Sequence, residues 1–232
     1  MTDDNATVAG NEVDGEYDAV LFDLDGVLLQ GPATPAAVYQ RAADDVITFF
    51  DLSTTDQQCR TLGKYHYDSQ LEDCCHSLDV DPASFWAARE RFASRRANRR
   101  MQGDGRQPYP DTAVLDELQV PLGIVSNNRQ ATVTFVADYF FEGLFPLAIG
   151  RERTPGGFAR RKPESYYLEQ ALDRLDEHNP LYVGDRVVDV QAATGAGLDT
   201  AFIRREHNGN MNPDPPPAFD IDSLAELPGI VD

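Results

Sequence analysis

The second half of the chain alternates short apolar runs with segments of helical periodicity. The runs are three or four residues long, which suits strands better than helices, and they cover residues 122–125, 147–149, 181–183 and 200–203. Between them lie segments whose periodicity or position predicts helices: 131–141, 165–175 and 187–196. This βαβα order predicts an α/β fold, a Rossmann-like parallel sheet in three layers with helices on both faces.

A further apolar run lies near the N-terminus, at residues 19–22. It is apolar at every position, which indicates a strand buried on both faces, as in a parallel sheet. The run is followed by Asp23 and then by Gly26, a residue that permits a sharp turn. We therefore expect this segment to join the same sheet and to turn away directly after it.

The stretch from about residue 34 to residue 102 has helical periodicity. We expect it to form an all-helical domain inserted into the α/β core. The predicted division is an inserted domain at residues 32–107 and a core made of residues 17–31 and 108–232. Residues 1–16 are polar and acidic without apolar periodicity, and we expect a disordered tail there.

The chain is strongly acidic and poor in lysine. It has 39 acidic against 20 basic residues, a formal net charge of -19, and its only lysines are Lys64 and Lys162. Such a surface fits a protein kept soluble in concentrated salt, so we predict a halophilic protein; the alternative is an ordinary acidic protein. Nucleic-acid binding is disfavoured, because it depends on neutralising phosphates with positive charge.

The sequence shows neither an apolar run long enough to cross a bilayer nor a secretory signal. We therefore expect a cytoplasmic protein without a membrane partner. The three cysteines make a poor disulfide framework, and no cysteine or histidine spacing suggests zinc. We expect solvated or packing roles for the four scattered histidines: His66, His76, His178 and His207.

Acidic side chains stand where two of the predicted strands end. Asp23 and Asp25 follow the first strand and fall on one side of an extended chain. Asp185 follows another strand, and Asp189 lies one helical turn further on. In an open α/β sheet, ligands bind beyond the carboxyl ends of the strands. Neighbouring carboxylates repel unless a cation lies between them or one of them is protonated, and we interpret these aspartates as a Mg²⁺ site.

Two features concern basic residues. Lys162 precedes Pro163 at a predicted helix start, and in a chain with one other lysine we interpret it as functional rather than as a solvated surface group. Six arginines lie close together near the end of the inserted domain: Arg89, Arg91, Arg95, Arg96, Arg99 and Arg100. We interpret them first as surface ion-pair partners; the alternative is that one or two bind an anionic tail of a substrate.

Four short motifs occur in a fixed order along the chain. They are residues 22–27 (FDLDGV), 125–128 (VSNN), 161–163 (RKP) and 183–189 (VGDRVVD). In this order, each at a strand end or helix start, they resemble the signature motifs of the haloacid dehalogenase superfamily. The helical insertion between the first and second motifs resembles the cap of the phosphoglycolate phosphatase-like branch. The resemblance runs from about residue 18 to residue 227.

The resemblance implies catalytic roles for three residues. Asp23 is expected to be the nucleophile that becomes an aspartyl-phosphate. Asp25 is expected to protonate the leaving oxygen and then to take a proton from the attacking water. Lys162 is expected to neutralise charge on the nucleophile and on the phosphate.

The resemblance also implies the ligands of the metal and of the substrate. Mg²⁺ is expected to be bound by Asp23, the backbone carbonyl of Asp25, and Asp185. Asp189 is expected to bind the metal through water or to orient the catalytic lysine. Ser126 and the backbone N–H of Asn127 are expected to donate hydrogen bonds to phosphoryl oxygens.

The expected function is Mg²⁺-dependent hydrolysis of a small phosphorylated metabolite. A haloacid dehalogenase is less favoured, because dehalogenases of this fold lack an acid at the position of Asp25. A sugar phosphomutase remains possible, as does a non-catalytic module that binds a phosphorylated ligand or a protein. The substrate and the oligomeric state stay open at this stage.

Overall fold

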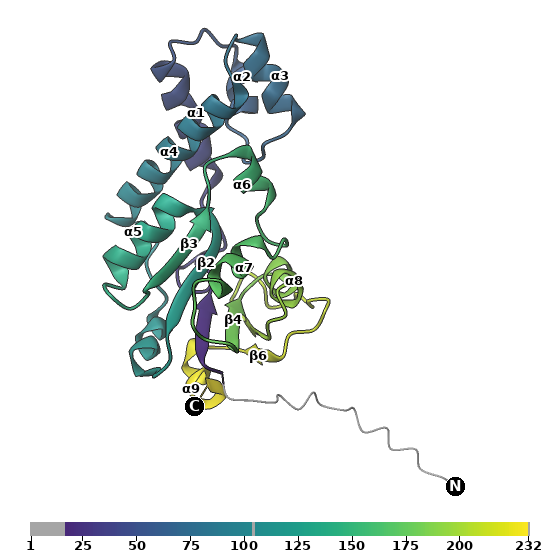
Figure 1. Ribbon diagram of the computed structural model, residues 1–232. Coiled ribbons are helices and arrows are strands. Elements are labelled where there is room, and N and C mark those ends of the chain that lie inside the picture. Colours follow the sequence, from purple (N-terminus) through teal and green to yellow (C-terminus); the bar gives the residue numbers. More distant parts are fainter. Residues whose placement is uncertain (1–16, 104, 232) are drawn as a thin grey trace.

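The core is a six-stranded parallel sheet, seen in the computed structural model, which describes residues 17–103 and 105–231 (Figure 1). The strand order is β3-β2-β1-β4-β5-β6, and every neighbouring pair is parallel. The strands are β1 (Ala19–Phe22), β2 (Leu122–Arg129), β3 (Leu147–Arg151), β4 (Pro180–Gly184), β5 (Thr200–Ile203) and β6 (Phe219–Ile221). The predicted parallel α/β fold is confirmed. The tail predicted at residues 1–16 lies outside the described residues.

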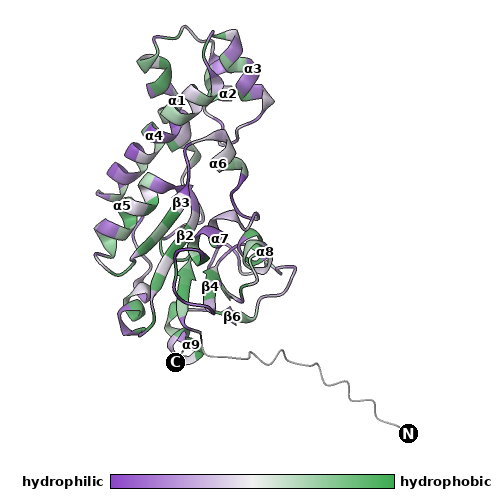
Figure 2. Ribbon diagram, viewed as in Figure 1, coloured by the Kyte–Doolittle hydropathy of each residue, from purple (hydrophilic) through white to green (hydrophobic). Residues whose placement is uncertain are grey.

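Helices cover both faces of the sheet because its central strands are apolar on both sides. On β1, Val20 and Phe22 belong to one buried cluster, whereas Leu21 belongs to the other. The first cluster includes α5 (Gln130–Phe140) and the C-terminal η2 (Leu224–Glu226) and α9 (Pro228–Val231). The second includes α7 (Tyr166–Leu172) and α8 (Val187–Gly195). The apolar colour of the strands in Figure 2 reflects this burial.

Four helices form the segment inserted after β1, at the top of Figure 1. They are α1 (Ala36–Phe49), α2 (Asp56–Leu62), α3 (Ser69–Ser77) and α4 (Pro82–Met101). Each of the last three begins with a capping side chain that accepts a backbone hydrogen bond: Thr55, Asp68 and Asp81. These helices enclose a third apolar cluster around Trp86 and Phe85, both fully buried. We refer to them as the helical cap.

Buried charged groups join the cap to the core. Glu90 on α4 forms ion pairs with Arg89 of the same helix and with Arg151 at the end of β3. Arg129, at the end of β2, donates from Nε to Ser94 Oγ on α4 at 3.1 Å. Burial alone would raise the pKa of Glu90, but the neighbouring arginines outweigh it and lower the pKa. The ends of β2 and β3 are thus tied to one cap helix.

Some elements differ from those expected. Strand β2 runs on to Arg129, so Ser126 and Asn127 lie within it rather than after it, and its register against β3 shifts between Ser126 and Arg129. The segment after the cap, where the sequence predicts a helix that includes Val114 and Leu115, forms a 3-10 helix, η1 (Pro110–Glu117). A short helix, α6 (Pro155–Ala159), and the edge strand β6 were not expected. No helix in the described part of the chain is long and apolar enough to cross a membrane.

Candidate active site

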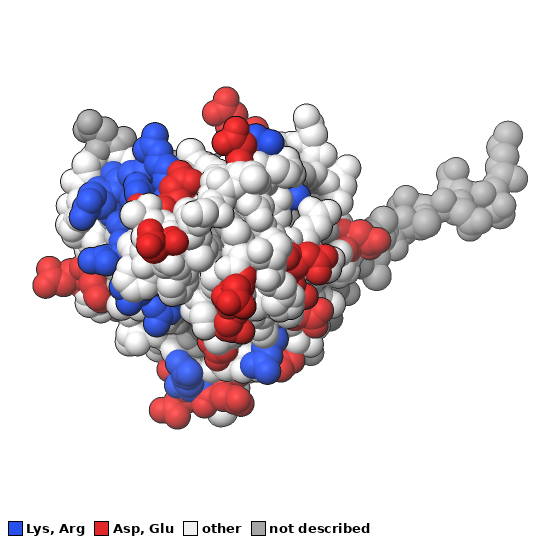
Figure 3. Space-filling model, turned by 90° about the horizontal axis from the view of Figure 1, so that it is seen from above, with Lys and Arg blue, Asp and Glu red and all other residues white. Residues whose placement is uncertain are grey.

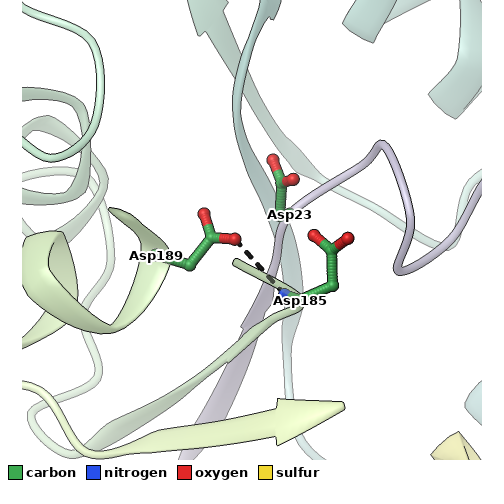
Figure 4. Close-up of side chains that lie close together, drawn as sticks. All are labelled: Asp23, Asp185 and Asp189. Atoms are coloured by element: carbon green, nitrogen blue, oxygen red, sulfur yellow. Dashed lines mark hydrogen bonds between the residues drawn. The ribbon is translucent and has the colours of Figure 1, made fainter. Parts of the chain in front are cut away.

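Three buried carboxylates meet at the carboxyl edge of the sheet (Figure 4). Asp23 directly follows β1, Asp185 directly follows β4, and Asp189 lies in the first turn of α8. One oxygen from each lies within 4.8 Å of the others. The backbone N–H groups of Asp185 and Arg186 donate to Asp189 Oδ2 at 3.2 and 3.0 Å, which fixes that carboxylate against the turn. Adjacent parallel strands therefore bring together acids that lie far apart in the sequence.

Two glycines allow these carboxylates to approach the backbone. Gly26 has a φ of +89°, and a Cβ there would lie 2.1 Å from Asp185 Oδ2. A Cβ on Gly184 would lie 2.4 Å from the Cβ of Asp189. A larger residue at either position would therefore displace one of these aspartates.

Lys162 lies between two of the carboxylates. Its Nζ is 2.8 Å from Asp23 Oδ1 and 2.6 Å from Asp189 Oδ1, and it donates to the hydroxyl of Tyr182 at 2.5 Å. Burial alone would lower the pKa of this amine, but the charges of Asp189 and Asp23 outweigh it and raise the pKa well above its ordinary value. Lys162 is therefore a fixed positive charge beside Asp23.

The carboxylate of Asp25 lies outside the group of three. It accepts hydrogen bonds from Arg106 Nη1 at 2.5 Å and from Asn128 Nδ2 at 2.9 Å. Asp25 also lines the cavity described below. Arg106 was not singled out from the sequence, because nothing in its local pattern links it to Asp25, 81 residues away.

The two polar residues of β2 have different surroundings. Ser126 is buried, and its Oγ accepts from the backbone N–H of Asn128 at 3.2 Å. The side chain of Asn127 holds the segment that carries the lysine: it donates to the carbonyl of Lys162 at 3.0 Å and accepts from its N–H at 2.7 Å. Both residues line the same cavity as Asp23.

A cavity of about 480 Å³ opens above these residues, between core and cap. The core contributes Asp23, Asp25, Ser126, Asn127, Lys162 and Asp189, and the cap contributes Tyr39, Tyr65 and His66. Two arginines that were not expected here, Arg161 and Arg186, also line it. The cavity can hold a small ligand that carries negative charge.

The acidic group suits a divalent cation. Burial, followed by the charges of Asp189 and Asp23, raises the pKa of Asp185 to about 9. Asp185 Oδ1 is buried and has no hydrogen-bond partner among the described residues. Oxygen ligands close together, one of them unsatisfied, are the donors that Mg²⁺ prefers. The residues therefore fit such an ion.

Two residues of the loop after β5 also contact Asp185. His207 Nε2 lies 2.5 Å from Asp185 Oδ2, and Asn208 Nδ2 donates to the Asp185 carbonyl at 2.7 Å. Burial and the nearby Arg186 and Arg205 lower the pKa of His207. The expectation that the histidines have only solvated or packing roles is therefore wrong for His207. No periodicity in this loop could have revealed the contact.

The arginines of α4 do not line this cavity. Arg89 is buried with Glu90, and Arg96 pairs with Asp45 on α1 at 2.5 Å. No ion pair is found in the described chain for the remaining four: Arg91, Arg95, Arg99 and Arg100. The interpretation as surface ion-pair partners therefore holds for Arg96, whereas the ion pair of Arg89 is buried. Figure 3, viewed from the cap end, shows basic atoms gathered along its left side.

Fold and site together define a class of protein: a Rossmann-like α/β protein with a helical cap and a lysine-bridged acidic centre at the strand ends. The chain belongs to the haloacid dehalogenase-like hydrolase family, whose sequence model matches residues 17–197. The resemblance noted in the four motifs is thereby confirmed.

Individual proteins are similar to the chain in sequence or in fold. The chain is 28% identical over 134 residues to a phosphoglycolate phosphatase of Rhodobacter capsulatus; the match covers 56% of this chain and 59% of that protein. A predicted phosphoglycolate phosphatase from Haemophilus somnus has a similar fold, with a TM-score of 0.60, 16% identity and coverage of 94% and 100%. CbbY from Rhodobacter sphaeroides, solved in complex with phosphate, gives a TM-score of 0.58, 18% identity and coverage of 91% and 96%.

Proposed function

We propose that the protein is a Mg²⁺-dependent phosphatase that hydrolyses a small phosphomonoester through an aspartyl-phosphate intermediate. One observation carries the proposal: Asp23 lies at the floor of a cavity, ion-paired to a buried lysine and beside two further buried carboxylates. A carboxylate in this setting can approach a phosphorus atom, because positive charge offsets its repulsion from the phosphate.

Asp23, Asp185 and Asp189 would hold the ion, together with the backbone carbonyl of Asp25. When bound, Mg²⁺ supplies charge that offsets the repulsion between the carboxylates and the phosphate. In this arrangement Asp23 forms the bond to phosphorus, and Lys162 neutralises charge beside it. Ser126 and the N–H of Asn127 donate to the phosphoryl oxygens, which fixes the group in line with the nucleophile.

Asp25 is proposed to carry out the proton transfers. Its carboxylate faces the cavity and is oriented from two sides by Arg106 and Asn128. In the first step it protonates the leaving oxygen, and in the second it takes a proton from the water that hydrolyses the intermediate. This residue also favours a phosphatase over a dehalogenase, since a halide leaves without protonation.

The cavity favours a small, strongly anionic metabolite. Its size and its basic lining by Arg161 and Arg186 suit a compound with a second anionic group. The relative from Rhodobacter capsulatus is a phosphoglycolate phosphatase, and phosphoglycolate combines a phosphate with a carboxylate. Another structure similar in fold, a CbbY variant from Rhodobacter sphaeroides, was solved with xylulose-1,5-bisphosphate. Phosphoglycolate and sugar bisphosphates are therefore the first substrates to test.

We also propose the division into a core, residues 17–31 and 108–232, and a cap, residues 32–107. The separate apolar cluster of the cap helices supports this division.

We also propose that the protein is adapted to high salt, which its acidic, lysine-poor composition supports. We propose the cytoplasm as its location.

A metabolite screen tests the function. Phosphate release from phosphoglycolate, sugar phosphates and nucleotides is measured in low and molar KCl, with Mg²⁺ and with EDTA. We expect hydrolysis of at least one of these compounds with Mg²⁺ and a loss of at least about 10²-fold with EDTA. Isomerised sugar phosphate without free phosphate would identify a mutase instead. Binding without turnover would identify a non-catalytic module.

Magnesium should also stabilise the protein in a way that depends on pH. The pKa of Asp185 is about 9 in the folded, metal-free protein against an ordinary value of 3.8, so folding favours its protonated form. The metal-free protein therefore loses stability as the pH rises from about 4 towards 9. We expect the rise in Tm on adding Mg²⁺ to be larger at pH 8 than at pH 6. An equal rise in Tm at pH 6 and pH 8 would contradict the coupling between Mg²⁺ binding and the deprotonation of Asp185.

Replacing Arg186 with alanine tests the second anionic group. We expect the KM for phosphoglycolate to rise about tenfold, while the KM for p-nitrophenyl phosphate, which lacks such a group, changes little. The matched control is Arg174→Ala, because Arg174 is an exposed arginine just after α7 and does not line the cavity. Equal changes for both substrates would show that Arg186 acts on the common phosphate.

A further inference from the structure

The loop that follows β5 contacts Asp185 at two separate atoms. His207 Nε2 lies 2.5 Å from Oδ2 of the side chain, while Asn208 Nδ2 donates to the backbone carbonyl at 2.7 Å. His207 thus acts on the carboxylate, and Asn208 on the backbone that carries it. No other described residue has a hydrogen bond or ion pair to the carboxylate of Asp185.

The loop itself is firmly anchored. Asn208 is 1% exposed and also donates to the carbonyl of Ile203 at 2.9 Å, while its Oδ1 accepts from the backbone N–H of Arg205 at 2.7 Å. Arg205 in turn makes two hydrogen bonds to Asp111, at 2.8 and 3.1 Å, and one to the carbonyl of Val27 at 3.1 Å. His207 therefore approaches Asp185 from a rigid support.

The contact divides the roles of the two oxygens of Asp185. Oδ2 is occupied by His207, whereas Oδ1 is buried and has no hydrogen-bond partner among the described residues. We propose that His207 is a positioning residue that fixes the rotation of the Asp185 carboxylate, so that Oδ1 is presented to a divalent cation. The inference rests on the proposed metal site and assigns this histidine a part in it.

His207 acts through Asp185 and is not itself a ligand. Its Nε2 is already engaged with Oδ2, so direct ligation by that nitrogen would require this hydrogen bond to break. When Asp185 is ionised, the Nε2–H of His207 donates a hydrogen bond to its carboxylate. Carboxylates that bind metals commonly accept such a hydrogen bond, which restrains their rotation. A side chain that offers an N–H at the same place should replace it.

Direct metal titration tests the inference without reliance on turnover. The full chain is titrated with Mn²⁺ alone, and the free ion is measured by electron paramagnetic resonance. We expect His207→Ala to weaken Mn²⁺ binding by about 10–100-fold. His207→Gln retains an N–H donor and is expected to recover most of the affinity. His178→Ala, an exposed histidine away from the site, should bind as the wild type does.

The outcomes separate this inference from the proposed function. Thermal melting in EDTA shows whether each variant is folded. If His207→Ala does not fold, the Mn²⁺ affinity of His207→Gln decides the test. Wild-type affinity in a folded His207→Ala would overturn the positioning role alone. A His207→Gln variant that is folded yet as weak as His207→Ala would overturn it in favour of direct ligation. Failure of the wild type to bind Mn²⁺ would remove the metal site, and the inference with it.

Discussion

Asp23→Asn is expected to reduce phosphatase turnover by roughly 10⁴-fold or more. An amide cannot replace the carboxylate as nucleophile, and no other described carboxylate combines the buried contact to Lys162 with a position directly after β1. Asp189 also contacts this lysine, but its Oδ2 is held by the backbone N–H groups of residues 185 and 186. The loss should appear in kcat, because the nucleophile acts in the chemical step.

The control is a variant with the same chemical change elsewhere. Asp73, on α3, is exposed, and Asp73→Asn should retain wild-type turnover. Asp23→Asn should remain folded, because it relieves repulsion from two other acids while it loses one ion pair, and Tm and circular dichroism check this. Turnover by a folded Asp23→Asn within tenfold of the wild type would exclude Asp23 as the nucleophile.

Lys162→Met is expected to lower turnover by roughly 10²–10³-fold. The amine is the buried positive charge between Asp23 and Asp189, and methionine preserves much of its volume without its charge. Removal of one partner from a buried ion pair also destabilises a protein, typically by about 3–5 kcal/mol. We expect a loss of this order in the metal-free protein, measured by urea unfolding.

The chain offers a matched control for this variant in its other lysine. Lys64 is exposed in the cap and donates to Gln70 Oε1 at 2.6 Å. Lys64→Met should leave both turnover and the free energy of unfolding nearly unchanged. If Lys162→Met and Lys64→Met had the same turnover and the same free energy of unfolding, the contacts of Lys162 with the acids would contribute to neither.

The sequence predicted the fold well where one physical pattern dominated. A strand such as Ala19–Phe22 is apolar at each position. Both of its faces can be buried only in a sheet that has helices packed on both sides. The edge strand β6 has only three residues, of which Asp220 is exposed, so it lacks such a pattern. Likewise, the extension of β2 through Ser126 and Asn127 depends on pairing with β3, which is not visible in local composition.

The candidate site was predictable where the residues follow strands. Asp23 and Asp185 directly follow neighbouring parallel strands, so the topology alone brings them together. Arg106 and His207 come from loops whose paths are set by tertiary contacts. Arg106 contacts Asp25 across 81 residues and His207 contacts Asp185 across 22 residues, and no spacing in the chain indicates either contact.

Identification of a phosphorylated residue tests the central claim most directly. A substrate with a radiolabelled phosphoryl group is mixed with the full chain and Mg²⁺, the reaction is quenched in acid within milliseconds, and the digest is analysed by mass spectrometry. We predict a labelled peptide with the phosphoryl group on Asp23, seen only with Mg²⁺ and absent from Asp23→Asn. A phosphoryl group on any other residue would contradict the account.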